Sequence, residues 1–334
     1  MLSRIGESIY WLARFLERAK NVARFLDVHA QLLLEQPWGT LGDGPANETF
    51  LPVFSLLGET DEFRAAWPGR PADRAAAVDH LVLDLDRPSS VRSIVRAARE
   101  NGRAVRDRIS REMWEELNTF HHALVGLEAE AVREHPHATL IDICRRIQRI
   151  YGVAEATLLH DGGFLLFRTG LFLERAGLTA RLLRGRWFKL QAVEFRGLPV
   201  EPLGAAILKA ASAFEAYRKV HHARMEARRV AEFLLFEPAF PRTVRFCLAS
   251  VDYAVRGLRR SPPGSSSTIA ERATGRALAD LAYAEPGRAF KGQFGLDDFL
   301  ARVLDHCDRI GEAIAESHFL HLPEEMLVDF RSAP

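Results

Sequence analysis

Apolar residues recur every three or four positions along most of this chain, the spacing typical of helices with one buried face. The clearest case covers residues 3–34, where Ile9, Leu12 and Leu16 belong to one apolar stripe. A proline and a glycine-rich stretch at residues 37–45 end this predicted helix. The pattern therefore predicts a long amphipathic helix at the start of the chain.

Further helices are predicted along the rest of the sequence, and Pro136 is expected to stop one of them. Their ranges are 50–57, 71–83, 91–109, 111–134, 140–160, 164–183, 203–222, 224–236, 244–258, 269–284 and 296–321. Regular alternation of apolar and polar residues is almost absent, and only residues 187–195 would allow a short strand. The predicted fold class is all-α, a bundle of many helices joined by short loops.

One segment of the predicted first helix occurs twice. Residues 15–26 and 172–183 share eight of twelve positions. Two weaker echoes keep the same order along the chain, pairing 88–92 with 241–245 and 102–107 with 275–280. The repeats predict two duplicated helical halves, 1–157 and 158–334, packed as one domain about a pseudo-twofold axis. A serine- and proline-rich run at 261–267 is expected to be a mobile loop inserted in the second half.

Each copy of the repeat carries an adjacent glutamate and arginine, Glu17-Arg18 and Glu174-Arg175. Neighbours on a helix point about 100° apart, so the two members of a pair need partners elsewhere. In a structural interpretation, Glu17 pairs with Arg175 and Glu174 with Arg18 across the axis. In a functional interpretation, the four groups line a pocket for an anionic or zwitterionic ligand. Both interpretations remain open at the level of sequence.

The surroundings of the two copies differ in polarity. Arg14 and Asn21 flank Glu17, whereas the corresponding positions of the second copy are Leu171 and Leu178. This difference is expected if one half keeps a site and the other keeps only packing.

A separate predicted helix places Arg99, Arg103 and Arg106 on one face, at spacings of four and three residues. Three adjacent guanidinium groups repel one another unless acids or an anion lie opposite. Acidic helices of this same chain are the structural interpretation, and a ligand is the functional one.

Composition and charge narrow the class of protein. The chain has 334 residues, 48% of them hydrophobic, and a net charge of +1, so nothing draws it as a whole to nucleic acid or membrane. Basic clusters are short or interrupted by acids, which argues against nucleic-acid binding. Three widely separated cysteines suit reduced thiols, and no apolar run reaches the roughly 18 residues of a membrane span. These features predict a soluble cytoplasmic protein.

Several catalytic signatures are missing. The sequence has no Walker A loop, no G-x-G-x-x-G and no G-x-S-x-G elbow. Paired Glu-x-x-His motifs are also absent, and the helix-end pair His318 and His321 is expected to be solvated. We therefore predict no metal and no cofactor, with any ATP bound by a partner.

Six short segments, in order along the chain, resemble the bacterial alpha-E family, whose name refers to a helical domain with a conserved Glu-Arg motif. They are MLSR at 1–4, YWLARFLERA at 10–19, ARENGR at 98–103, LERA at 173–176, RVAEFLL at 229–235 and FPRTV at 240–244. The departures are Gly102, where a small Ala is usual, and Leu171, which replaces the polar lead-in of the second motif.

The resemblance implies partners more than a reaction. Members of the family are companions of circularly permuted ATP-grasp ligases and of transglutaminase-like proteins, which suggests a role in peptide or amide-bond synthesis. The resemblance singles out Glu17, Arg18, Arg99, Asn101, Arg103, Glu174, Arg175 and Arg242. Arg14, Asn21 and Arg106 join them as candidate ligand-binding or polar-core residues from the spacing argument alone.

Two functions remain open. The first is a helical accessory or scaffold protein that works with an ATP-grasp-type ligase in a peptide or amide-bond modification system. The second is an enzyme, a transferase or ligase component, whose Glu/Arg centre binds a carboxylate substrate and uses Glu17 or Glu174 as acid or base.

Overall fold

The structure is a computed structural model that describes residues 3–35, 45, 47–258, 267–284, 290 and 295–319. Every regular element in these ranges is a helix, so the all-α prediction is confirmed. The prediction that residues 187–195 could form a short strand was wrong, because this segment is the last part of helix α9 (Gly162–Phe195). Its buried side chains Leu183, Trp187 and Leu190 continue the helical spacing of the preceding turns.

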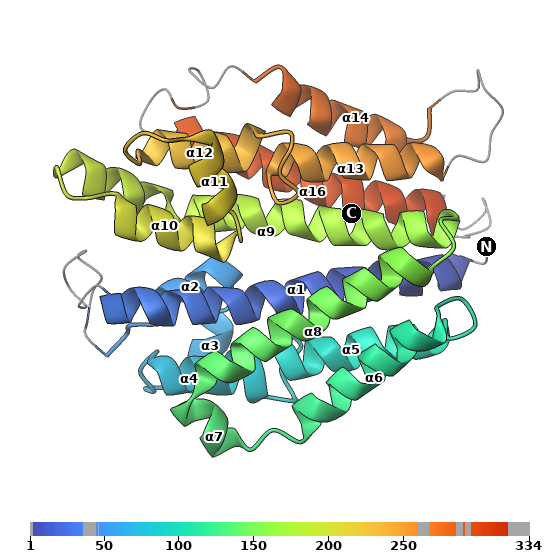
Figure 1. Cartoon of the computed structure of the whole chain (residues 1–334), viewed down its shortest axis with the longest axis horizontal. Helices are drawn as coiled ribbons and strands as arrows, with labels where there is room; N and C mark the ends of the chain where they lie inside the picture. The colour runs from blue at the N-terminus through green and yellow to red at the C-terminus, as the bar shows by residue number, and fades with distance from the viewer. Residues whose placement is uncertain are drawn as a thin grey trace, which may run out of the picture.

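Two long helices, α1 (Ser3–Glu35) and α9, pack on each other through the middle of the molecule (Figure 1). Tyr10, Arg14, Glu17 and Arg18 of α1 face Gly170, Glu174 and Arg175 of α9. The closest approach is at Gly170, where an added Cβ would collide with the backbone carbonyl oxygen of Tyr10.

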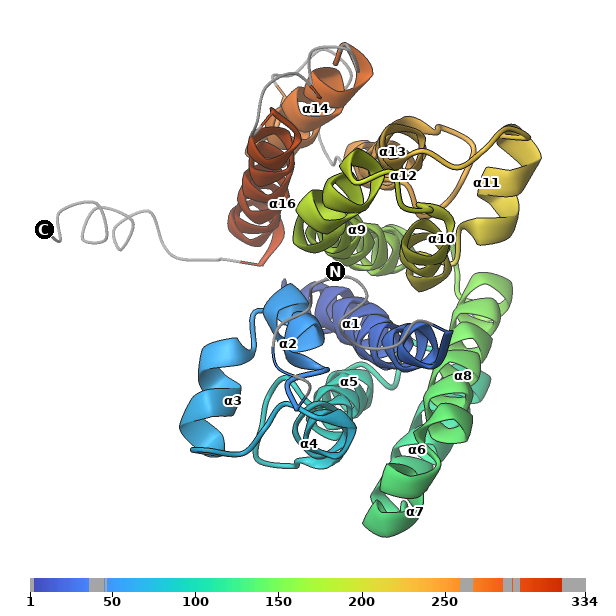
Figure 2. The same cartoon turned by 90° about the vertical axis from the view of Figure 1, so that its left-hand side faces the viewer.

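Each long helix belongs to a group of four. In the first group α1 packs on α5 (Val91–Ala104) and α8 (Pro136–Thr157), and α6 (Arg111–Val125) packs on both of those helices. In the second group α9 packs on α13 (Val244–Gly257) and α16 (Gly295–His318), and α14 (Ile269–Ala282) packs on both. Figure 2 shows the groups side by side, with α1 and α9 facing each other between them.

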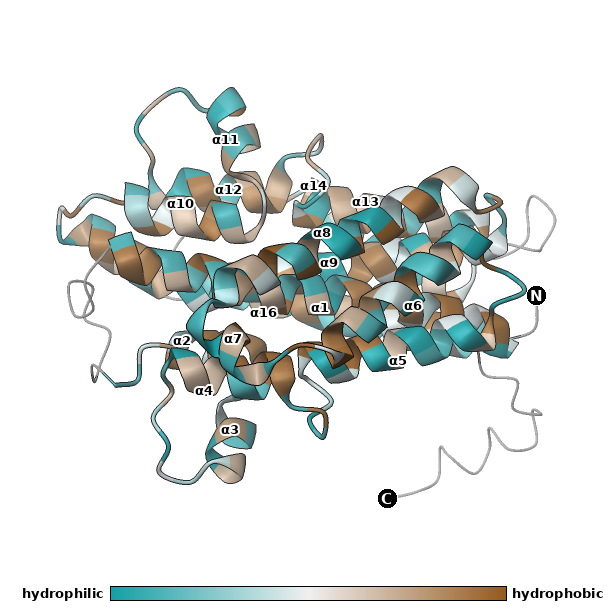
Figure 3. Ribbon diagram, turned by 60° about the horizontal axis from the view of Figure 1, so that its bottom comes forward, coloured by the Kyte–Doolittle hydropathy of each residue, from teal (hydrophilic) through white to brown (hydrophobic). Residues whose placement is uncertain are grey.

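Shorter helices complete the described chain. They are α2 (Leu51–Leu57), α3 (Thr60–Ala66), α4 (Arg74–Val78), the π-helix η1 (Asp79–Leu83), α7 (Ala129–Glu134), α10 (Glu201–Ala210), α11 (Phe214–Val220) and α12 (Ala227–Phe236). The buried apolar residues of all these helices and of the two groups form one continuous core. Hydrophilic residues recur along the outer helices α5, α6 and α8, whose apolar faces pack inward (Figure 3).

Several predicted helix boundaries needed correction. Pro136 was expected to end a helix, but it is the first residue of α8. Proline fits there because the amide of the first helical residue donates no hydrogen bond within the helix. The predicted helix 111–134 is divided at Gly126, and α3 was not predicted. The predicted loop 261–267, apart from Ser267, and His321 of the histidine pair lie outside the described residues.

Candidate functional site

Glu17 lies in the middle of α1, is fully buried, and faces α9. Arg175 donates two hydrogen bonds to its carboxylate, from Nε to Oε1 at 3.0 Å and from Nη2 to Oε2 at 3.1 Å. The hydroxyl of Tyr151 donates to Oε2 at 2.9 Å, and the amide of Asn21 donates to Oε1 at 3.1 Å. Arg242 places Nη2 3.1 Å from Oε1, as a charge contact without hydrogen-bond alignment. Glu17 therefore has a complete set of protein partners and leaves no face for a ligand.

The loop before α13 brings Arg242 into this core. Arg175 donates from Nη1 to the carbonyl oxygen of Pro241 at 3.0 Å, and the Thr179 hydroxyl donates to the carbonyl oxygen of Arg242 at 3.1 Å. The hydroxyl of Thr243 then accepts from the amide of Phe246 and caps α13. Side chains of α9 thus fix the loop, which explains how a residue so distant in sequence reaches Glu17.

The charges around Glu17 shift the pKa values of their neighbours. Burial alone would raise the pKa of Glu17, but the positive charges of Arg175, Lys20 and Arg242 outweigh burial and hold it well below its usual range. Lys20 has its Nζ 3.8 Å from Oε2 of Glu17, and burial lowers its pKa to about 7. A carboxylate that stays ionised cannot act as a general acid at neutral pH.

The second carboxylate, Glu174 on α9, has partners on α1. Arg14 donates from Nε at 2.8 Å, and Arg18 donates from Nε at 2.7 Å and from Nη2 at 3.2 Å. Arg14 also donates from Nη1 to the hydroxyl of Tyr10 at 3.2 Å and lies over the ring of Trp11. Burial would raise the pKa of Glu174, but Arg14 and Arg18 outweigh burial and lower it.

Both pairings expected from the structural interpretation, Glu17 with Arg175 and Glu174 with Arg18, are therefore present. Both carboxylates are buried, with side chains that are 0% and 4% exposed, but their ionic groups differ in access to solvent. The side chain of Glu17 is completely covered, whereas the side chain of Arg18 beside Glu174 is 36% exposed. The interior of the molecule thus contains a closed ionic group around Glu17, and a second group around Glu174 reaches the surface.

A recess between α1, α9 and α16 opens beside Glu174. Arg14, Arg18 and the exposed Arg181 line it together with Glu174 and Asp308. The recess therefore has three cations against two acids, and it borders a wider, open groove that is also lined by Arg181. An excess of positive charge in a concave surface attracts an anion. We name this feature the Glu174 recess.

The arginines of α5 stand apart from both carboxylates. Arg99 donates to the Asn118 side chain at 2.8 Å, and Arg99 and Arg103 both pair with Glu100. The expectation that acids from other helices face these arginines was wrong, because Glu100 belongs to α5 itself. Arg99 and Arg106 also lie over the ring of Trp114, each at 5.5 Å.

Asn101 donates its side-chain amide to the carbonyl oxygen of Ala97 within α5. Among the described residues, no hydrogen bond or ion pair connects Arg99, Asn101, Arg103 or Arg106 with Glu17 or Glu174. These four candidates therefore do not belong to the paired Glu-Arg site.

Other chemistry is limited in the ranges that the structure describes. No group of three or more His, Cys, Asp and Glu side chains there could hold a metal ion. Burial raises the pKa of Cys247 and Cys307 to about 12, so neither thiol is a ready nucleophile at neutral pH. No helix in the same ranges is both long and apolar enough to cross a membrane.

Sequence reasoning missed several members of the site. Lys20 lies within the first repeated segment but has no counterpart in the second, where Gly177 stands. Tyr151 carries no motif, and only the packing of α8 reveals its role. Arg181 does lie in the second repeated segment, where it matches Arg24 of the first, but its place beside the recess follows only from the structure.

The fold and the paired carboxylates define a class of protein, an all-helical protein in which glutamate-arginine pairs join two central helices. The chain belongs to the Alpha-E family: the model of that family, described as a predicted alpha-helical domain with a conserved ER motif, matches residues 1–319. The resemblance inferred from the sequence is thus confirmed.

Known relatives extend well beyond the matched region. Uncharacterized proteins of Mycobacterium bovis and Mycobacterium tuberculosis are 25% identical to this chain over 281 residues, which is 79% of the chain and 30% of each relative. The chain therefore spans less than a third of the length of these relatives. No solved structure matches it.

Proposed function

We propose that this Alpha-E protein is a helical accessory or scaffold protein that acts with an ATP-grasp-type ligase in a peptide or amide-bond modification system. The complete enclosure of Glu17 carries the proposal. Because Arg175, Arg242 and Tyr151 occupy this carboxylate, the motif that gives the family its name serves to hold α1 on α9. In the mycobacterial relatives the matched part is 30% of their own length, which is consistent with a domain that works next to other domains.

We also propose that the two groups of four helices arose by duplication. Corresponding helices have corresponding neighbours, as the sequence repeats predict. The caps correspond as well: Ser90 caps α5 and donates to the carbonyl of Asp84, and Thr243 caps α13 and donates to the carbonyl of Glu237. In both cases the acceptor lies six residues before the cap.

In this proposal the Glu174 recess receives an anionic group from the shared substrate, and the partner binds ATP. Arg14 and Arg18 already hold Glu174, but Arg18 is partly exposed and Arg181 is exposed, so both can turn toward a carboxylate or phosphate. Either a circularly permuted ATP-grasp protein or a transglutaminase-like protein could supply the reacting partner.

The alternative is an enzyme with its Glu/Arg centre at Glu174. Its position in a recess that reaches solvent favours this candidate. The lowered pKa of Glu174 argues against the enzyme alternative, because a carboxylate held ionised by Arg14 and Arg18 is a weak proton donor and a weak base. We therefore keep the accessory function as the conclusion.

The test combines this chain with the circularly permuted ATP-grasp protein of the same genome. We expect the two to co-elute in size-exclusion chromatography, and ADP release that depends on both a carboxylate and an amine to rise when this chain is added. We expect this chain alone to release no ADP. ADP release by the isolated chain, or a partner whose activity is unchanged by it, would contradict the proposal.

Variants separate the two functions. Arg181→Gln should weaken the stimulation while the melting temperature stays close to that of the wild type, because Arg181 is exposed, and Arg196→Gln, an exposed change at the end of α9, is the matched control. If Glu174→Gln abolished turnover in a complex that still forms and is stable, the enzyme alternative would replace the accessory function.

A further inference from the structure

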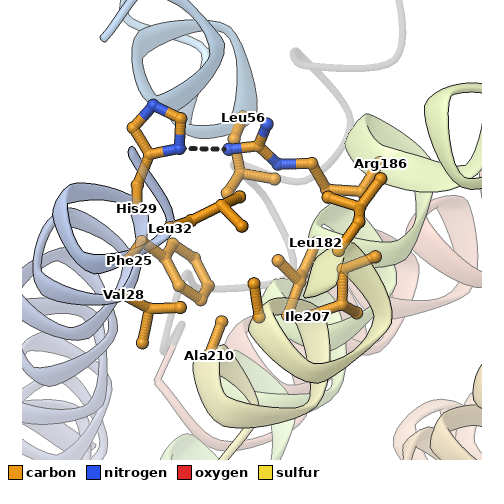
Figure 4. A pocket seen from close by; sticks show the side chains of 11 residues that line it. Phe25, Val28, His29, Leu32, Leu56, Leu182, Arg186, Ile207 and Ala210 are labelled. Carbon is orange, nitrogen blue, oxygen red and sulfur yellow. Dashed lines mark hydrogen bonds between the residues drawn. The ribbon is translucent and has the colours of Figure 1, made fainter. Parts of the chain in front are cut away.

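A second recess lies between α1, α2, α9 and α10, near the C-terminal ends of the two long helices (Figure 4). Its walls are mostly apolar and include Phe25, Leu182 and Ile207. Two nitrogen-bearing side chains also face it, His29 from α1 and Arg186 from α9. We name this feature the Arg186 recess. It shares no lining residue with the Glu174 recess.

Among the residues that the structure describes, Arg186 is a buried cation without a counter-charge. The residue is 8% exposed, and the hydrogen bond that it makes within the described part of the chain runs from Nη2 to Nδ1 of His29 at 3.2 Å. No described carboxylate pairs with it. Burial lowers its pKa to about 10, so the guanidinium keeps its charge at neutral pH. An uncompensated charge away from water is costly, and proteins normally provide an opposite charge for it.

His29 does not supply a second positive charge. Its Nε2 lies 2.8 Å from the carbonyl oxygen of Thr49 and must donate to it, so Nδ1 is left to accept from Arg186. Burial and the positive charges of Arg186 and Lys189 lower the pKa of His29 to about 3. The imidazole is therefore neutral and holds the guanidinium in place, and the recess itself has a single positive charge.

The remaining features describe a ligand. Val28 and Ala206 are the lining residues that are partly exposed, which places the mouth between α1 and α10. The recess is narrow and open at its mouth, so it admits only a small molecule. One guanidinium balances a monoanion and suits the two oxygens of a carboxylate, whereas a dianionic phosphate would need a second cation. The apolar walls suit a short hydrocarbon chain.

We propose that the Arg186 recess binds a small monocarboxylate with a short aliphatic chain, with the carboxylate on Arg186 and the chain between Phe25, Leu182 and Ile207. The carboxylate comes either from a free acid or from the end of a peptide whose last residue is aliphatic. The inference does not depend on the proposed function, because it uses neither Glu-Arg pair.

The experiment measures binding to the full chain by titration calorimetry. The probes are 4-methylpentanoate as the free acid, N-acetyl-leucine as the peptide-like acid, and 4-methylpentanamide as the uncharged control. We expect one or both acids to bind and the amide to bind at least about tenfold more weakly, because it lacks the charge-assisted hydrogen bonds. Binding by the free acid alone assigns the source as a metabolite, and binding by N-acetyl-leucine alone assigns it as a peptide end.

Two variants connect binding with the recess. Arg186→Gln should weaken acid binding at least about tenfold, and Ala206→Phe should do so by filling the mouth, while Arg196→Gln on the same helix leaves it unchanged. The protein should tolerate Arg186→Gln, because the change removes a buried charge that has no partner, and thermal unfolding checks this point. Failure of both acids to bind in the millimolar range, or equal binding by Arg186→Gln, overturns the proposal.

Discussion

At the scale of residues, the molecule is organised by buried charges that satisfy one another across the two central helices. Three cations, Arg175, Arg242 and Lys20, surround the single carboxylate of Glu17. Such a group adds little stability over apolar packing, but the loss of one member leaves the others uncompensated. Glu17 is the member on which the others depend most, because it is the one acid.

Replacing Glu17 by Gln should therefore lower the free energy of unfolding by about 3–5 kcal/mol. The amide keeps the size of the side chain but leaves Arg175 and Arg242 buried without an anion. Denaturant unfolding measures the change, and Glu7→Gln on the exposed side of α1 is the control, with no measurable effect expected. A Glu17→Gln protein as stable as the wild type would show that water or a rearrangement compensates the two arginines.

Lys20 makes stability depend on pH in a defined window. Its pKa is about 7 in the folded protein and 10.5 when unfolded, so between these values the unfolded chain binds more protons and stability rises with pH. The slope from Lys20 is at most about 1.4 kcal/mol per pH unit. We expect the stability difference between wild type and Lys20→Met to grow in favour of the wild type from pH about 7 to about 8.5, a range over which the ionisation of cysteines affects both proteins alike. Urea unfolding at several pH values measures it, and a difference that does not vary with pH would contradict the low pKa.

Part of this chemistry could be predicted from the sequence. The pairing of Glu17 with Arg175 and of Glu174 with Arg18 followed from the repeat and from the rule that adjacent helix residues point apart. The family resemblance singled out Arg242, but its contact with Glu17 could not be predicted, because it comes from a loop. The contribution of Tyr151 could not be predicted either, because it comes from α8 through tertiary packing that no local pattern encodes.

At the scale of elements, the close approach of α1 and α9 requires a glycine. Gly170 has no room for a side chain against the backbone of Tyr10, whereas Gly177, two turns further along α9, has open space around its Cα. The same residue type thus has opposite roles at two positions of one helix.

Gly170→Ala should destabilise the protein by about 1–3 kcal/mol, because the two helices must move apart to admit the methyl group. Gly177→Ala is the matched change and should stabilise it by about 0.5–1 kcal/mol, because alanine loses less backbone entropy in a helix. Thermal and denaturant unfolding of both variants measure the contrast. Equal effects at the two positions would show that the contact at Tyr10 is not tight in solution.

Helix existence was predictable from sequence, but helix ends were less so. The apolar stripe of α1 and the caps at Ser90 and Thr243 carry their own signals. The continuation of α9 through 187–195 was ambiguous, because a short apolar run fits a strand or a buried helix equally well, and only the packing of Trp187 and Leu190 decides between them.

At the scale of the whole molecule, two four-helix groups meet along α1 and α9. The connection between the groups is short, and Leu159 within it is 79% exposed. The contact of the two long helices and the two ion-pair groups, not this connection, hold the halves together.

A protease site inserted between Leu159 and His160 should therefore be cut without separation of the halves. We expect the cleaved chain to elute as one particle of unchanged size and to unfold in one transition. Size-exclusion chromatography and circular dichroism check this, with the uncut insertion protein as the control. Two separate fragments after cleavage would show that covalent connection is needed and that the α1 and α9 contact is weak.

The reciprocal pairing also constrains how the protein can be made. Ribosomes deliver the chain from its N-terminus, so α1 emerges with Arg14, Glu17 and Arg18 long before their partners on α9 exist. The N-terminal half cannot reach its final state until Arg175 has left the exit tunnel. Nascent chains that end before α9 are consequently the form most exposed to degradation and in most need of chaperones.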